Sequence, residues 1–239
     1  MREDICTIPI SEVFEPRDGC PICRMRNTLE NRVTEYITGA AMMEPDVRIV
    51  TNRMGFCYDH FAMMLHKGSR LSNALILESH LKEIGKQIMH LEDKKSIPGK
   101  KELAMADELA HSCFVCERIE WAMTRMFDTI YRLWQSEEEF RTLYAQQPYL
   151  CIPHYVQLMK GAGKGVPRKQ QDAFARATAE IAGRYLKELQ ADVTHFCSMF
   201  DYRNNGGDWG NSKDSIERAI CYLTSREVGW NERIEDVKQ

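Results

Sequence analysis

The sequence contains no long apolar run. None of its stretches approaches the roughly 20 apolar residues that a helix needs to cross a bilayer. The N-terminal residues MREDICTIPI also lack a basic segment followed by an apolar core, which is the pattern of a secretory signal. We therefore expect a cytoplasmic protein with no membrane partner.

Excess positive charge and catalytic motifs are missing as well. The 239 residues carry a formal charge of −3, so no general attraction to phosphate backbones is expected and there is no strong nucleic-acid signal. We find no paired carboxylates, nucleophile elbow or cofactor fingerprint. With 44% hydrophobic and 28% charged residues, the composition is that of an ordinary globular protein. An enzyme is therefore the less favoured class.

Sustained alternation of apolar and polar residues is a third absence, and it argues against β-strands. Apolar residues recur instead at helical spacing, in matching runs after Cys23 and Cys116 and in longer runs over residues 71–92 and 169–200. The expected core stripe of the run after Cys23 is Leu29, Val33, Tyr36 and Ile37, that of the run after Cys116 is Ile119, Met123, Met126, Ile130 and Leu133, and that of residues 71–92 is Leu71, Leu75, Leu81, Ile84, Ile88 and Leu91. The fold is predicted to be all-α, packed as a helical bundle.

Cysteine, in contrast, is abundant, and six of the nine cysteines join two histidines in a repeated pattern. Four pairs of ligand-type residues make up the pattern: a first CxxC pair (Cys20, Cys23), a first CxxH pair (Cys57, His60), a second CxxC pair (Cys113, Cys116) and a second CxxH pair (Cys151, His154). The second half follows the first at offsets of 93 or 94 residues. This indicates an internal duplication.

Each half of the pattern supplies three thiolates and one imidazole, the ligand set of a closed tetrahedral zinc site. We expect each CxxC pair to combine with the CxxH pair of its own half. Two residues three apart at a helix start converge on one point, and the partial positive charge of the helix N-terminus offsets the excess charge of three thiolates. The prediction is two structural zinc ions per chain.

Other chemistries for these cysteines are less favoured. An iron-sulfur centre also accepts thiolate ligands. A redox dithiol at Cys20 and Cys23 would need a βαβ context, and it leaves the CxxH pairs unexplained. Cys6, Cys197 and Cys221 fall outside the pattern and are expected to be free buried thiols.

The repeat also predicts the domain organisation. Residues 1–95 form a first CxxC/CxxH helical unit and residues 101–199 a second, joined by a linker around Pro98 and Gly99. The glycine-rich segment 160–169 in the second unit is basic but lacks the features of a phosphate-binding P-loop, so we expect a flexible interhelical loop there. In each unit, the short helix after the CxxH pair is expected to end at a glycine cap, Gly68 or Gly161.

Residues 200–239 have no counterpart in the first half and are expected to form a loop and a helix that pack on the bundle. Ser212 is the expected N-cap of that helix, whose apolar residues are Ile216, Ile220 and Leu223. The loop concentrates polar and aromatic side chains, as ligand-binding loops do. The alternative is a latch that satisfies its own backbone and packs Trp209 onto the bundle. The residues for possible ligand binding are Asp201, Tyr202, Arg203, Asn204, Trp209 and Asn211.

The chain resembles an uncharacterised bacterial family classified only as a domain of unknown function. The matching motifs are CPIC at Cys20, GFCxxH from Gly55 to His60, the second CxxC and CxxH pairs, FDYRN from Phe200, and W.NSKD from Trp209. This resemblance covers essentially the whole chain. It implies that the tail motif is a family hallmark, and it brings no activity, substrate or partner.

Together these observations predict a zinc-binding, all-α protein that acts as a binding or scaffold protein for an unknown protein or small-molecule partner. Two alternatives remain open at this point. One is a metal-handling or thiol-redox protein, and the other is an enzyme that uses the Asp201–Asn211 loop.

Overall fold

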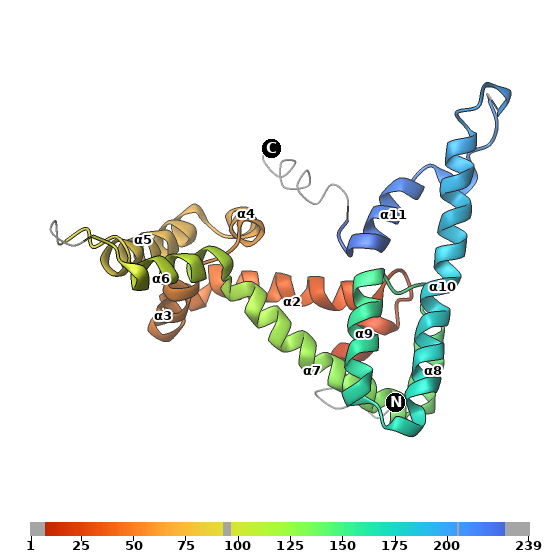
Figure 1. The fold of residues 1–239 in the computed structure, drawn as a ribbon, viewed down its shortest axis with the longest axis horizontal. Helices are drawn as coiled ribbons and strands as arrows, with labels where there is room; N and C mark the ends of the chain where they lie inside the picture. Colours follow the sequence, from red (N-terminus) through yellow and green to blue (C-terminus); the bar gives the residue numbers. More distant parts are fainter. Residues whose placement is uncertain (1–7, 93–96, 205, 228–239) are drawn as a thin grey trace. The chain divides into compact units, whose positions relative to one another are not determined.

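The computed structural model describes residues 8–92, 97–204 and 206–227, and within these ranges the chain is all-α, as predicted. Eleven α-helices and three short 3-10 segments occur there, and no strand does (Figure 1). The helices are α1 (Ile8–Phe14), α2 (Pro21–Thr38), α3 (Pro45–Met54), α4 (Tyr58–Lys67), α5 (Arg70–Gln87), α6 (Lys100–His111), α7 (Phe114–Ser136), α8 (Glu138–Ala145), α9 (Ile152–Gly165), α10 (Arg168–Ser198) and α11 (Ser215–Thr224).

The chain forms two compact units that interleave along the sequence. One unit combines the described residues up to Arg26 with those from Met123 onward, and the other spans Asn27–Ala122. Helices α2 and α7 each begin in one unit and continue into the other. The predicted segments 1–95, 101–199 and 200–239 follow the sequence repeat, whereas these units follow the contacts.

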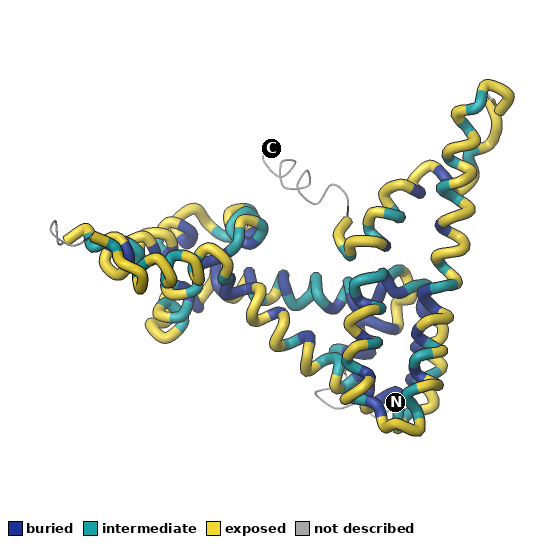
Figure 2. Tube along the Cα trace, in the orientation of Figure 1, coloured by how far each residue is buried: buried dark blue, intermediate teal, exposed yellow. Residues whose placement is uncertain are grey.

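The first unit has an aromatic core. The ring of Phe14 from α1 lies 5.2 Å from that of Phe140 and 5.9 Å from that of Tyr144, both in α8. Phe174 of α10 packs against Tyr144 and, edge-on, against Trp134 of α7 at 5.2 Å. Because these rings come from four helices, their burial fixes α1, α7, α8 and α10 together (Figure 2).

Helix α9 replaces the expected flexible loop at residues 160–169, so that expectation is wrong. The helix continues through the glycines to Gly165 and packs against α10. A Cβ at Gly161 would lie 2.2 Å from Oη of Tyr131 in α7, and a Cβ at Gly165 would lie 2.1 Å from a ring carbon of the same tyrosine. Tyr131 in turn donates a hydrogen bond to the carbonyl of Leu158 at 2.9 Å. These two glycines therefore serve close helix packing rather than flexibility.

The second unit is built around α3, α4 and α5, and its core is partly polar. Asn73 of α5 donates to the carbonyl of Met64, and His80 of α5 is paired with the carbonyl of Asn52 at 2.9 Å. The apolar stripe expected over residues 71–92 is wrong in part. Leu71 and Leu81 of α5 are 67% and 62% exposed, and Leu91, which lies beyond the end of α5, is 74% exposed. The stripe expected on α7 is buried at Ile119, Met123, Ile130 and Leu133 and half-buried at Met126.

Several expected helix ends also differ. Gly68 follows α4 with φ −88°, so it is no left-handed cap, and Gly161 lies inside α9. Helix α11 is preceded by Asp214 rather than by Ser212, which closes the 3-10 turn Gly210–Ser212. The expected core residues Ile216, Ile220 and Leu223 of α11 are at least 41% exposed, and the helix buries Ser215 and Tyr222 instead.

Candidate metal centres

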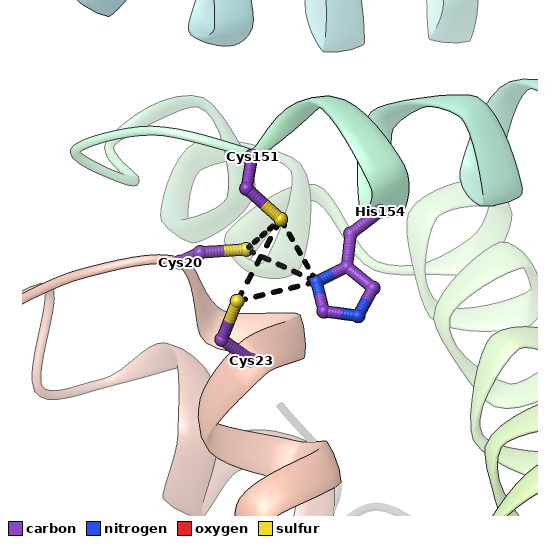
Figure 3. A group of neighbouring side chains, drawn as sticks. All are labelled: Cys20, Cys23, Cys151 and His154. Atoms are coloured by element: carbon purple, nitrogen blue, oxygen red, sulfur yellow. Dashed lines mark hydrogen bonds between the residues drawn. The ribbon is translucent and has the colours of Figure 1, made fainter. Parts of the chain in front are cut away.

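Four ligand-type side chains meet in the first unit, and we call them cluster A: Cys20, Cys23, Cys151 and His154. The two CxxC sulfurs come from the start of α2, and Cys151 and His154 come from the start of α9 (Figure 3). Sγ of Cys151 lies 3.9 Å from Sγ of Cys20 and 3.6 Å from Sγ of Cys23. The distances from Nδ1 of His154 to the three sulfurs are 3.7, 3.3 and 3.0 Å.

The second unit holds a matching group, cluster B: Cys57, His60, Cys113 and Cys116. Here Cys57 and His60 lie at the start of α4, and Cys113 and Cys116 at the start of α7. Nδ1 of His60 lies 3.1, 3.3 and 3.4 Å from the sulfurs of Cys57, Cys113 and Cys116. The sulfurs of Cys57 and Cys116 are 3.9 Å apart.

These distances fit the edges of a tetrahedron around one ion. With zinc bond lengths of about 2.3 Å to sulfur and about 2.05 Å to nitrogen, tetrahedral angles give about 3.8 Å between two sulfurs and about 3.6 Å between sulfur and nitrogen. In both clusters all four ligand atoms lie within 4.8 Å of one another. The sulfur separations also far exceed the ~2.05 Å of a disulfide. Both clusters could therefore hold a metal ion.

The predicted pairing of the ligands is wrong. The first CxxC pair meets the second CxxH pair in cluster A, and the second CxxC pair meets the first CxxH pair in cluster B. Cys23 and Cys151 of cluster A are 128 residues apart in the sequence. The same eight residues are gathered as candidate ligands, but the pairs are exchanged between the halves, because α2 and α7 cross from one unit into the other.

Backbone contacts position the two halves of cluster B. Gly55, just before the first CxxH pair, has φ +62° and ψ −158°, a conformation that favours glycine. Its carbonyl accepts a hydrogen bond from the backbone N–H of Phe114, and Ser112 donates to the carbonyl of Met54 at 2.6 Å. The glycine of the GFCxxH motif thus allows the turn that holds Cys57 beside Cys113.

In each cluster the neighbouring sulfurs shift one another's pKa values. Burial opposes ionisation of Cys20, but hydrogen bonds with Cys151, Cys23 and His154 hold its pKa well below the usual value. In cluster B, the hydrogen bond with Cys116, against the effect of burial, lowers the pKa of Cys113 to about 3. The pKa values of Cys23 and Cys116 are raised, chiefly by hydrogen bonding to the neighbouring sulfurs. Ionisation of one thiol therefore opposes ionisation of its neighbour. A divalent cation would offset this repulsion between thiolates.

Glu30 is a functional candidate that no motif in the sequence singles out. This residue of α2 is buried, and its Oε1 lies 2.9 Å from Nε2 of His60, the ring nitrogen on the side away from the sulfurs. Burial opposes protonation of His60, while hydrogen bonds with Cys113 and Glu30 raise its pKa to about 10. A carboxylate that is hydrogen-bonded to the far nitrogen of a ligand histidine fixes the ring orientation. It also makes the other ring nitrogen, here Nδ1, a stronger ligand for a metal ion. The only signal in the sequence was a charged residue beside the expected core stripe of α2.

The tail loop makes mostly internal contacts. The side chains of Asp201 and Arg203 pair with each other, and Asn204 donates to the carbonyl of Ser198 at the end of α10. The Trp209 ring packs edge-on against Phe196 and Phe200, at 5.4 and 5.9 Å.

Beyond the loop tip, the backbone carbonyl of Asn211 accepts a hydrogen bond from Arg218 of α11, which also pairs with Asp192 and Asp214. Tyr202 is 87% exposed. These contacts are of the kind expected for a latch, and both the latch and ligand binding by the loop stay predictions.

The cysteines outside the clusters differ from expectation in part. Cys197 is exposed on α10, so it is wrong to describe it as buried, and Cys221 is half-buried in α11. Cys6 lies outside the described residues. Among the helices of the described residues, none has the length and apolar character that a membrane span requires.

Comparison with known proteins assigns the chain to a family. A family described as "Family of unknown function (DUF6062)" matches residues 1–229, so the chain belongs to it. No curated protein and no solved structure matches the chain.

Proposed function

We propose that this member of the DUF6062 family binds two zinc ions, one in cluster A and one in cluster B, and uses them to hold together helices that are distant in the sequence. The observation that carries the proposal is the convergence of three sulfurs and one imidazole nitrogen within 4.8 Å, twice in one chain. Four protein ligands fill a tetrahedral site and leave no position for a reacting water, so the role we propose for zinc is structural.

Zinc is favoured over an iron-sulfur centre by the spacing of the ligands. A multinuclear cluster distributes its cysteine ligands over several iron atoms, whereas a single ion draws all four ligands to one point. The close packing of the ligand atoms in both clusters suits a single ion. Three thiolates with one histidine are also a common ligand set of structural zinc.

The two sites support an origin by internal duplication. In both clusters the CxxC pair begins a long helix, α2 or α7, and the CxxH pair begins a shorter one, α4 or α9. The histidine faces its sulfurs through Nδ1 in both cases. The repeat in the sequence and the repeat in the ligand geometry thus agree.

The biological role that we propose is binding or scaffolding in the cytoplasm, with a protein or small molecule as the partner. Thiolate ligands persist in a reducing compartment, which favours the cytoplasm. The metal-handling or thiol-redox alternative has one observation in its favour, because Cys116 of cluster B is exposed. An enzyme that uses the Asp201–Asn211 loop would need a ligand there, and the loop contacts described above favour a latch.

Elemental analysis of the purified protein tests the proposal. We expect about two zinc ions per chain, and replacement by Co²⁺ should give the intense visible bands of tetrahedral thiolate coordination. Removing the metal with a chelator should lower the melting temperature, because binding energy at such sites is folding energy. Metal-free protein with the same melting temperature and freely reactive thiols would refute a structural zinc role.

A further inference from the structure

The two clusters differ in their access to solvent. In cluster A, Cys20, Cys151 and His154 are buried and Cys23 is half-buried. In cluster B, His60 and Cys113 are buried, Cys57 is half-buried and Cys116 is exposed. Cysteine reactivity follows thiolate character and exposure, so matched ligand sets with unequal exposure should react at unequal rates.

The clusters also differ in whether a carboxylate is hydrogen-bonded to the ligand histidine. Glu30 pairs with Nε2 of His60 in cluster B, while among the described residues no carboxylate is hydrogen-bonded to His154 in cluster A. Zinc with three thiolates carries a net charge of −1, and the Glu30 carboxylate adds a second negative charge next to cluster B. More negative charge raises electron density on the sulfurs and makes them better nucleophiles.

We propose that cluster B is a peroxide-reactive site that releases its zinc, with Cys116 as the residue modified first, and that cluster A releases its zinc much more slowly. The proposal rests on the proposed function, since it requires zinc in both clusters. The reactant is a hydroperoxide, which is small enough to reach an exposed sulfur and accepts two electrons.

The reaction balances in two steps. Sγ of Cys116 attacks one peroxide oxygen, the O–O bond breaks, hydroxide leaves, and Cys116 becomes a sulfenic acid. The thiolate of Cys57, 3.9 Å away, then attacks the Cys116 sulfur, the S–S bond forms and a second hydroxide leaves. Two thiolates are oxidised to one disulfide and one hydrogen peroxide is reduced to two hydroxides. The zinc has then lost two of its four ligands and dissociates.

The test uses the full-length zinc-loaded protein and hydrogen peroxide, with a zinc-sensitive dye in the solution. We expect two phases of about one zinc each, the first at least about tenfold faster than the second. In Cys116→His, cluster B keeps four ligands without the exposed thiol, so the fast phase should slow to about the rate of cluster A. The matched control is Cys23→His, which makes the same exchange at the equivalent position of cluster A and should leave the fast phase unchanged.

A second measurement needs no variant. Wild-type protein is quenched after the fast phase, its remaining thiols are alkylated, and its peptides are analysed by mass spectrometry. Cys57 and Cys116 should be oxidised while Cys20, Cys23 and Cys151 remain reduced. Release of both ions at one rate, or first oxidation at cluster A, would overturn the inference. Protein that never held two zinc ions would instead contradict the proposed function.

Discussion

Three glycines in α9 offer a sharp test of the helix packing in the first unit. A Cβ added at Gly161 would lie 2.2 Å from Oη of Tyr131, whereas a Cβ added at Gly163 would have no heavy atom within 4 Å. Both residues are helical and only two positions apart. Gly161→Ala and Gly163→Ala therefore differ in packing and share the same gain in helix propensity.

The magnitudes follow from these contacts. Exchanging glycine for alanine inside a helix contributes about 1 kcal/mol of stability. At Gly161 this gain is opposed by overpacking, which costs about 1–3 kcal/mol. Displacing Tyr131 also breaks its hydrogen bond to Leu158, at about 1 kcal/mol. Gly161→Ala should thus destabilise the protein by about 1–3 kcal/mol, and Gly163→Ala should stabilise it by about 1 kcal/mol.

Urea denaturation of the zinc-loaded variants, followed by circular dichroism, measures both effects. Tyr131→Phe removes the atom closest to the new methyl group and should recover part of the stability lost in Gly161→Ala. The same change should not rescue Gly165→Ala, whose Cβ meets a ring carbon instead of the hydroxyl. Equal stability of Gly161→Ala and Gly163→Ala would refute close packing of α9 on Tyr131.

Three further predictions concern cluster B and the tail. Gly55→Ala places a side chain on a residue with positive φ, which costs about 1–3 kcal/mol, and should weaken zinc retention at cluster B. The control is Gly19→Ala beside cluster A, where the new methyl group would meet no neighbouring atom. It should change neither the melting temperature nor the zinc content. Glu30→Gln should lower zinc affinity at cluster B about 10–100-fold in chelator competition and leave the other zinc unaffected; unchanged affinity would remove Glu30 from the site. Arg218→Met should cost about 1–2 kcal/mol in urea denaturation because it breaks the half-buried ion pair with Asp192. Arg203→Met at the exposed tip should leave stability unchanged, and the reverse order would contradict the latch.

The ligand residues were predictable because their chemistry is local. A CxxC or CxxH pair at a helix start brings its two side chains together through helix geometry alone, and the structure gathers all eight residues. Their pairing was not predictable in the same way. Each CxxC pair can complete the same ligand set with either CxxH pair, so spacing cannot choose between them. The choice depends on the paths of α2 and α7, which pass from one unit to the other.

The apolar stripes predicted for the helices also agree with the structure only in part. The stripe on α7 was predicted well because its apolar residues meet an apolar core. On α5 the buried side includes Asn73 and His80, whose side chains bond to backbone carbonyls of neighbouring helices. Hydrophobic periodicity alone gives no information on such polar contacts. The sequence alone predicts a loop at the glycines of α9, because their close partner, Tyr131, lies on another helix.

The crossed pairing of the ligands is the central claim, and zinc counting in two multiple variants tests it most directly. The first variant changes the first CxxC pair and the second CxxH pair to serine, which removes every ligand of cluster A. The second changes the first CxxC pair and the first CxxH pair to serine, which removes half of each cluster. The crossed arrangement predicts about one zinc per chain in the first variant and close to none in the second. One zinc in the second variant and none in the first would contradict it.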